Sequence, residues 1–301
     1  MIFKFHYKLI ASAIIILQFS SCSSQNEKAT SQRISDVEVK ADHFEMPPIP
    51  DSISFCGVTV RIDNFDLKER LDRELIVNTY RHSATIQYIK RAKRFFPEIE
   101  KALVKNGIPE DMKYLCVAES GLAQVTSRSG AKGFWQFMSP TAKEYGLKIN
   151  TEIDERMNVE KSTSAACKYL NAANKKFDDW FLAAAAYNRG TGGIQRDLDA
   201  QKVTSYFDLQ MPEETNRYVF RIIALKIVME NPEAYGFNPE KFELYEPIVT
   251  KTLNVTSSIA NLSDWAVENG STYRMLRLLN PWIIGIKLTY RNESYKIHLP
   301  K

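Results

Sequence analysis

The sequence has 301 residues, a formal net charge of +4 and a pI near 8.7. This small positive excess is too weak to indicate a nucleic-acid partner, although it is compatible with an anionic polymer. The four histidines and four cysteines are scattered, and no spacing among them is typical of a zinc site. We therefore expect no metal and no cofactor.

The first 21 residues are typical of an export signal. Two lysines precede an apolar run over residues 9–19, which is too short to span a bilayer as a helix. The run ends in Ser20-Ser21-Cys22, which resembles the lipobox of bacterial lipoproteins, although an ordinary signal peptide with a chance cysteine is the alternative. We expect residues 1–21 to be a signal peptide and Cys22 to carry a lipid anchor. No acidic run follows Cys22, which favours an outer-membrane lipoprotein that faces the periplasm.

Three cysteines remain after Cys22, namely Cys56, Cys116 and Cys167. Their odd number excludes a framework in which all of them form disulfides. Cys116 and Cys167 lie in helical patterns, where small buried thiols are common. Free thiols are therefore expected, and a Cys116–Cys167 bridge in an oxidising periplasm is the alternative.

The rest of the chain divides into a tether, a helical domain and a C-terminal domain. Polar residues that end in Pro47–Pro50 predict a tether over residues 22–64. Residues 65–240 carry helical periodicity, interrupted by proline and glycine signals such as Pro97, and are long enough for one all-helical core. Residues 246–301 complete the chain. The predicted fold class is mainly α, with a small α+β domain at the end.

The stretch from Pro109 to Ser120 predicts a helix with an unusual carboxylate. Its apolar stripe runs through Met112, Leu115 and Cys116, and the next position on that face is Glu119. Burying an ionised carboxylate is costly, so such a group finds a partner or its pKa rises. A carboxyl that stays protonated near neutral pH is what general-acid cleavage of a glycosidic bond requires. From this helix alone, a structural glutamate is an equal alternative.

A glycine-rich stretch follows over residues 127–138. Gly130 and Gly133 allow the backbone to turn and to approach a ligand closely. Trp135 either packs under a helix or lines a cleft. Gln136 offers both a donor and an acceptor to a polar ligand.

Four motifs together resemble a known family. They are Glu119-Ser120, Gly133–Met138, Ala186–Gly190 and the helix start Thr215–Tyr218. Their order and approximate spacing are similar to those of the lytic transglycosylases with a goose-lysozyme-like (SLT) fold, over roughly residues 66–237. Each motif alone is compatible with ordinary helix packing, so the resemblance rests on the order of all four.

The resemblance implies a lysozyme-like catalytic domain in which Glu119 is the catalytic acid/base. The residues that it places around the substrate are Ser120, Ser127, Gln136, Tyr187, Asn188 and Tyr218. Tyr218 is expected near the reacting sugar. Ser127 follows a stretch, residues 122–126, that is one residue shorter than in the family and lacks its Asn-Pro.

The implied function is cleavage of the glycan strands of peptidoglycan at the bond between N-acetylmuramic acid and N-acetylglucosamine. The family releases 1,6-anhydro ends without using water, and it needs one carboxyl group rather than the pair of ordinary glycosidases. Two alternatives stay open at this point: a lysozyme-type muramidase that uses water, and a non-catalytic anchor that binds peptidoglycan. The oligomeric state is also open.

The C-terminal domain, residues 246–301, is predicted to fold as strand, helix, helix and strand, with the last strand over residues 283–299. At about 50 residues it is small enough to be marginally stable alone. Trp265-Ala266 and Leu279-Asn280-Pro281 resemble a degenerate LysM repeat, a small glycan-binding unit. A structural appendage is the alternative.

Overall fold

The computed structural model describes residues 45–301, so the expected signal peptide and Cys22 lie outside the described residues. Among residues 45–301, no helix is both long enough and apolar enough to cross a membrane. The α-helices are α2 (Phe65–Tyr80), α3 (His82–Lys105), α4 (Lys113–Ser120), α5 (Ser139–Glu144), α6 (Val159–Phe177), α7 (Trp180–Arg189), α8 (Thr191–Gln201), α9 (Glu213–Glu230), α10 (Leu262–Glu268) and α11 (Tyr273–Leu279). Short 3-10 helices are η1 (Glu110–Met112), η2 (Glu155–Met157), η3 (Tyr206–Asp208), η4 (Pro232–Tyr235) and η5 (Pro239–Lys241).

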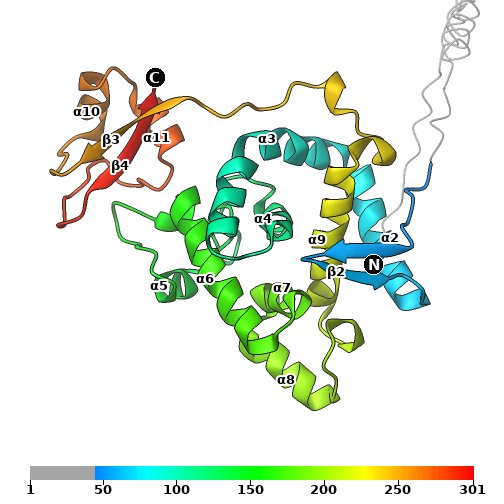
Figure 1. Ribbon diagram of the computed structural model, residues 1–301. Helices are drawn as coiled ribbons and strands as arrows, with labels where there is room; N and C mark the ends of the chain where they lie inside the picture. Colours follow the sequence, from blue (N-terminus) through cyan, green and yellow to red (C-terminus); the bar gives the residue numbers. More distant parts are fainter. Residues whose placement is uncertain (1–44) are drawn as a thin grey trace, which may run out of the picture. The chain divides into compact units, whose positions relative to one another are not determined.

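The helical body (residues 65–241) surrounds the short helix α4. Figure 1 shows α4 inside a ring of longer helices, and α4 packs against α3 and α9. Four consecutive residues of α4, Tyr114–Val117, are buried. The alanine run Ala183–Ala186 of α7 is fully buried as well, and its small side chains allow neighbouring helices to come close. Helix α4 is therefore held in the core, with only its last turn available for a site.

Asparagine and aspartate side chains fix where several helices begin. Asn64 accepts a hydrogen bond from the backbone of Leu67 at the start of α2, and Asp179 does the same at the start of α7. Such caps contribute about 1 kcal/mol each. The predicted break at Pro97 is wrong, because α3 continues through it. A proline removes one backbone hydrogen bond, but the buried Ile99 and Leu103 keep the rest of the helix packed.

The predicted tether extends too far, because residues 52–61 form a β-hairpin. Strands β1 (Ser52–Phe55) and β2 (Val58–Arg61) pair antiparallel, with Ser52 opposite Arg61. Alternate residues of β1 point into the core, and Ile53 and Phe55 are almost completely buried there. The Phe55 ring lies 5.4 Å from that of Phe181 on α7. The compact unit starts at Met46, so the boundary expected at residue 64 is corrected to this position.

The C-terminal module (residues 250–301) has the predicted order of strand, two helices and strand. Strands β3 (Thr250–Val255) and β4 (Tyr295–Pro300) pair antiparallel, with Thr250 opposite Pro300. The last strand is shorter than predicted, since residues 283–294 form a loop with isolated bridges only, such as Ile259 to Leu288. The mainly α fold class with a small α+β domain is confirmed.

Cys56, Cys116 and Cys167 are free thiols. Cys116 and Cys167 are fully buried, and their thiols point to the carbonyls of Phe134 and Ala102 respectively. The alternative Cys116–Cys167 bridge is therefore not formed. Burial raises the pKa of both thiols, which keeps them in the unreactive neutral form.

Candidate active site

Glu119 and Ser120 occupy the last turn of α4. The helix ends because Gly121 adopts a left-handed conformation, with φ of +58°, and its N–H donates to the Val117 carbonyl at 2.7 Å. Arg91 on α3 donates to the Gly121 carbonyl at 3.0 Å and holds this end in place. The turn brings Glu119 out of the fully buried stripe that precedes it, so that its side chain is only partly buried.

Tyr218 on α9 meets Glu119 directly. Its hydroxyl donates a hydrogen bond of 2.5 Å to Glu119 Oε1. Burial raises the pKa of Glu119 to about 7, while the Tyr218 hydrogen bond and the charge of Arg221 oppose this rise and Glu214 adds to it. At neutral pH the carboxyl is therefore present in both protonation states. A group with this property can act in turn as a general acid and a general base.

Tyr187 at the end of α7 stands beside the same carboxyl. Its hydroxyl donates to the Trp135 carbonyl at 2.8 Å, and its ring packs against Phe137 and Tyr169. Burial first, and then the charge of Glu119, hold the pKa of Tyr187 well above its usual range. Tyr187 is therefore an uncharged neighbour of Glu119.

Trp135 packs in the core and does not line a cleft. Its side chain is fully buried, and the indole N–H donates to Thr163 Oγ1 at 2.9 Å. The sequence left open whether Trp135 packs under a helix or lines a cleft, and the structure shows that it packs in the core.

Asn188 and Thr215 connect the third and fourth motifs. Asn188 is exposed, and its Oδ1 accepts a hydrogen bond of 2.9 Å from Thr215 Oγ1 on α9. This contact fixes the end of α7 against the start of α9, one helical turn from Tyr218.

Ser120, Ser127 and Gln136 are held mainly by local hydrogen bonds. Ser120 donates to the Cys116 carbonyl at 3.3 Å within α4. Ser127 and Gln136 belong to the glycine loop (residues 126–137), where Ser127 Oγ accepts from the Ala131 backbone and Gln136 Nε2 donates to the Gly133 carbonyl at 2.7 Å. Among the described residues, none of these hydrogen bonds reaches Glu119. Their roles as substrate contacts therefore remain proposals.

The close approach at Gly133 is to the protein itself. A Cβ atom there would lie 2.0 Å from the carbonyl oxygen of Arg156, and φ is +79°. The interpretation of Gly133 as a point of approach to a ligand is not needed to explain the glycine. Arg156 also donates Nη1 to the carbonyls of Gly130 and Phe137, at 2.9 and 3.2 Å. The glycine loop is thus wrapped around this arginine.

Asp154 and Glu155 both form structural ion pairs. Asp154 binds Arg156 through both oxygens, at 2.9 and 2.7 Å. Glu155 pairs with Lys161 and accepts a hydrogen bond from the backbone of Lys148. Both carboxylates are buried and engaged, which leaves neither of them as an obvious partner for Glu119.

A charged network on α9 went unnoticed in the sequence. Arg217 Nε donates to the buried Glu74 of α2 at 2.6 Å, and Arg221 lies between Glu74 and Glu214, at 3.7 and 3.1 Å. Arg221 is the cation named above that lowers the pKa of Glu119. Its signal in the sequence is the spacing of Glu214, Arg217 and Arg221 on one helical face, which is also typical of a solvated surface.

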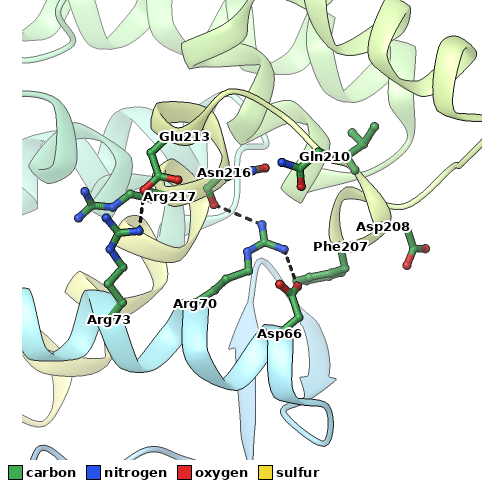
Figure 2. A pocket seen from close by; sticks show the side chains of 10 residues that line it. Asp66, Arg70, Arg73, Phe207, Asp208, Gln210, Glu213, Asn216 and Arg217 are labelled. Atoms are coloured by element: carbon green, nitrogen blue, oxygen red, sulfur yellow. Dashed lines mark hydrogen bonds and ion pairs between the residues drawn. The ribbon is translucent and has the colours of Figure 1, made fainter.

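A polar pocket of about 400 Å³ lies between α2, η3 and the start of α9. Figure 2 shows that two of its arginines are already paired: Arg70 contacts Asp66 and the Asn216 carbonyl, and Arg73 contacts Glu213. The Arg70 guanidinium also stacks over Phe220, 4.4 Å from the ring centre. These contacts brace α2 against α9, the helix that carries Tyr218.

Two sequence families match the chain. Residues 97–209 match the family described as Transglycosylase SLT domain, and residues 251–301 match the Soluble lytic transglycosylase C-terminal LysM-like domain. The chain contains an SLT domain and a LysM-like domain. The SLT match includes Glu119 and the glycine loop, whereas Tyr218 lies beyond its end.

Three individual relatives are similar to this chain, and two of them are named transglycosylases. The chain is 28% identical over 269 residues to membrane-bound lytic murein transglycosylase D of Escherichia coli K12. The matched region covers 86% of this chain and 58% of that protein. It is 36% identical over 99 residues to peptidoglycan transglycosylase gp16 of Escherichia phage T7. That matched region covers 32% of this chain and 8% of the phage protein. A putative tributyltin chloride resistance protein of an Alteromonas species is 32% identical over 110 residues, or 36% of this chain and 53% of that protein. The chain thus spans less than two thirds of the E. coli relative.

Proposed function

We propose that this chain is a lytic transglycosylase that cleaves the glycan strands of peptidoglycan. The observation that carries the proposal is the carboxyl of Glu119, whose pKa is near 7 and which accepts a hydrogen bond from Tyr218 inside an SLT domain. A group that is half-protonated at neutral pH is suited to protonate a leaving oxygen. The relatives named as murein and peptidoglycan transglycosylases support the same substrate.

The proposed reaction uses Glu119 twice. In the first step its acid form protonates the glycosidic oxygen between N-acetylmuramic acid and N-acetylglucosamine, and the bond from that oxygen to C1 breaks. The acetamido group of the substrate stabilises the positive charge that develops at C1. In the second step the carboxylate takes the proton from the C6 hydroxyl as that oxygen bonds to C1. The product carries a 1,6-anhydro ring, and Glu119 regains its proton.

One carboxyl is sufficient for this chemistry, because the nucleophile belongs to the substrate. An intramolecular hydroxyl has a high effective concentration and needs no activated water. A hydrolytic glycosidase requires a second carboxylate at a defined distance. Among the described residues, Glu214 is the acidic group whose charge raises the pKa of Glu119, and it is paired with Arg221. This pairing favours the transglycosylase over the hydrolytic alternative.

Ser120, Ser127, Gln136, Tyr187, Asn188 and Tyr218 are proposed to contact the glycan around Glu119. Neutral donors and acceptors of this kind suit sugar hydroxyl and acetamido groups. The LysM-like module is proposed to add affinity for the same polymer. For location, we propose a periplasm-facing outer-membrane lipoprotein anchored at Cys22, in keeping with the membrane-bound name of the E. coli relative.

Mass spectrometry of muropeptides released from purified peptidoglycan tests the proposal. The expected products end in 1,6-anhydro-N-acetylmuramic acid, and Glu119→Gln abolishes their release. Reducing N-acetylmuramic acid ends alone would assign the chain to the hydrolytic muramidases. Binding to peptidoglycan without any release by the wild-type chain would leave the non-catalytic anchor.

A further inference from the structure

The C-terminal module docks on one short stretch of the helical body, the docking segment (residues 149–156). The Glu152 carbonyl accepts hydrogen bonds from the backbones of Ile284 and Gly285, at 2.8 and 3.0 Å. Its carboxylate accepts two more from Thr289, one from the backbone N–H and one from the hydroxyl, both at 2.8 Å. The side chain of Glu152 is almost completely buried by these contacts. A carboxylate with this many partners makes a specific contact and is not a surface charge. We call the pair of hydrogen bonds from Thr289 to the Glu152 carboxylate the latch.

The docking segment also completes the core of the module. Ile153 is 2% exposed and packs within the hydrophobic cluster of the module, while it pairs as an isolated bridge with Ile283. The next backbone N–H, that of Asp154, donates to the Trp282 carbonyl at 2.8 Å. A module of about 50 residues has little core of its own. It therefore shares one with the helical body.

The same segment holds the glycine loop on its other side. Asp154 fixes the Arg156 guanidinium by two hydrogen bonds, and Lys132 of the loop pairs with Asp154 at 3.3 Å. Arg156 in turn binds the carbonyls of Gly130 and Phe137. A single residue, Ile153, thus separates Glu152, which binds the module, from Asp154, which holds the glycine loop through Arg156 and Lys132.

We infer that the C-terminal module positions the glycine loop for catalysis, through the docking segment. The inference rests on the proposed function, since it concerns the loop that carries Ser127 and Gln136. Regular secondary structure does not hold this loop, which has only isolated bridges at Thr126, Lys132 and Phe137. Its residue Gln136 has φ of +48°, a conformation that persists only when surrounding contacts impose it. Gln136 itself bonds to the Gly133 and Val125 carbonyls, and the carbonyl of the next residue, Phe137, is held by Arg156.

Glu152 is accordingly a positioning residue, distant from the chemistry of Glu119. Loss of its latch frees the docking segment on one side, and Arg156 then holds the loop less tightly. Glu119 itself stays in place, because α4 is fixed by its own core. We expect weaker substrate binding with little change in the pH profile, since burial in the helical core and groups on α9, not the docking segment, act on the pKa of Glu119.

The test compares full-length variants in which the latch is weakened. Glu152→Ala removes both hydrogen bonds to Thr289, and Thr289→Val removes one of them. Glu268→Ala, at an exposed position of α10, is the matched control. Hydrogen–deuterium exchange of residues 126–137 reports on the loop, and KM and kcat on soluble, uncross-linked glycan strands report on binding and chemistry.

In Glu152→Ala we expect faster hydrogen–deuterium exchange in the glycine loop and a KM raised by about 3- to 10-fold. The value of kcat should stay within about twofold of the wild type, and the pH profile should be unchanged. Glu152→Gln, which keeps one acceptor for Thr289, is expected to recover part of the loss. The Glu268→Ala control should match the wild type in every measurement. If Glu152→Ala does not fold, Thr289→Val is expected to show the same changes at smaller size.

Faster exchange in the module with unchanged exchange in residues 126–137 would overturn the inference. An unchanged KM in a folded latch variant would do the same. The exchange measurement does not depend on activity. If the wild-type chain releases no glycan, the proposed function fails, and the loop exchange still decides whether the module positions the loop.

Discussion

At the scale of single residues, one face of α9 adjusts the charge state that burial imposes on Glu119. Glu214, Tyr218 and Arg221 are spaced by four and three residues, so they share a helical face. Tyr218 and Arg221 stabilise the carboxylate, while Glu214 opposes it. Burial outweighs these effects and keeps the pKa near 7. Small changes on α9 therefore alter which form of Glu119 is present at neutral pH.

The first prediction concerns the pH dependence of glycan cleavage. The competent starting form of Glu119 is the acid, so kcat/KM should fall as pH rises through about 7. In Tyr218→Phe the carboxylate loses a hydrogen bond, its pKa rises further, and the alkaline limb moves to higher pH while kcat decreases. Tyr235→Phe, whose hydroxyl donates to the Pro48 carbonyl instead, is the control. An alkaline limb that stays in place in Tyr218→Phe contradicts the assignment.

A second prediction concerns the stability of Glu119→Gln. The folded chain binds the Glu119 proton up to a pH of about 7, whereas the unfolded chain loses it near the ordinary value of 4.5. Wild-type stability therefore falls as pH rises between these values, by at most on the order of 3 kcal/mol. The glutamine variant lacks this penalty. Its Tm should exceed that of the wild type by more at about pH 8 than at about pH 5, and an equal difference at both would refute the raised pKa.

The sequence could reveal Glu119 because a carboxylate interrupts an apolar stripe, and Tyr218 because a family resemblance named it. Glu74 and Arg221 were beyond its reach. Charged residues at helical spacing are typical of a solvated face, and only the packing of α2 on α9 buries Glu74. The contact of Tyr218 with Glu119 joins positions 99 residues apart, which no local pattern encodes.

At the scale of elements, the glycine loop depends on Arg156 more than on its own sequence. The glycines of residues 127–138 predicted a backbone turn that approaches a ligand closely. The structure has instead a loop whose backbone carbonyls face a buried guanidinium. The β1–β2 hairpin was missed for a related reason, because strands of four residues with one turn are too short for a periodic signal.

Alanine substitutions of the two loop glycines, Gly130 and Gly133, distinguish backbone strain from a steric clash of the new Cβ atom. Both have positive φ, +88° at Gly130 and +79° at Gly133, but a Cβ at Gly130 meets no atom within 4 Å. Gly130→Ala should therefore cost about 1–2 kcal/mol, the strain of the left-handed conformation alone. Gly133→Ala must also displace the Arg156 carbonyl, so its cost in urea unfolding should exceed about 3 kcal/mol. Equal losses for the two variants would show that the contact with Arg156 is unimportant.

At the scale of the whole described chain, the β1–β2 hairpin and the C-terminal module both share hydrophobic contacts with the helical body. The hairpin inserts Ile53 and Phe55 into the core of the helical body, with Phe55 beside Phe181 of α7, and the core of the C-terminal module includes Ile153. The sequence marked both parts as separate from the helical domain, one as a tether and the other as a second, LysM-like domain. Hydrophobic contacts across long sequence separations overrule such boundaries, because two or three buried side chains are enough to fix a short segment.

Phe55→Ala tests whether the hairpin belongs to the fold. Phe55 is fully buried and its ring lies 5.4 Å from that of Phe181, so truncation leaves a cavity in the core. The free energy of unfolding should fall by about 3–5 kcal/mol, with cleavage activity retained below the new Tm. Val58→Ala, on the exposed strand of the same hairpin, should change it by less than about 0.5 kcal/mol. Urea unfolding of the two variants decides the matter: a Phe55→Ala chain as stable as the Val58→Ala chain would return residues 52–61 to the tether, because a tether has no core to lose.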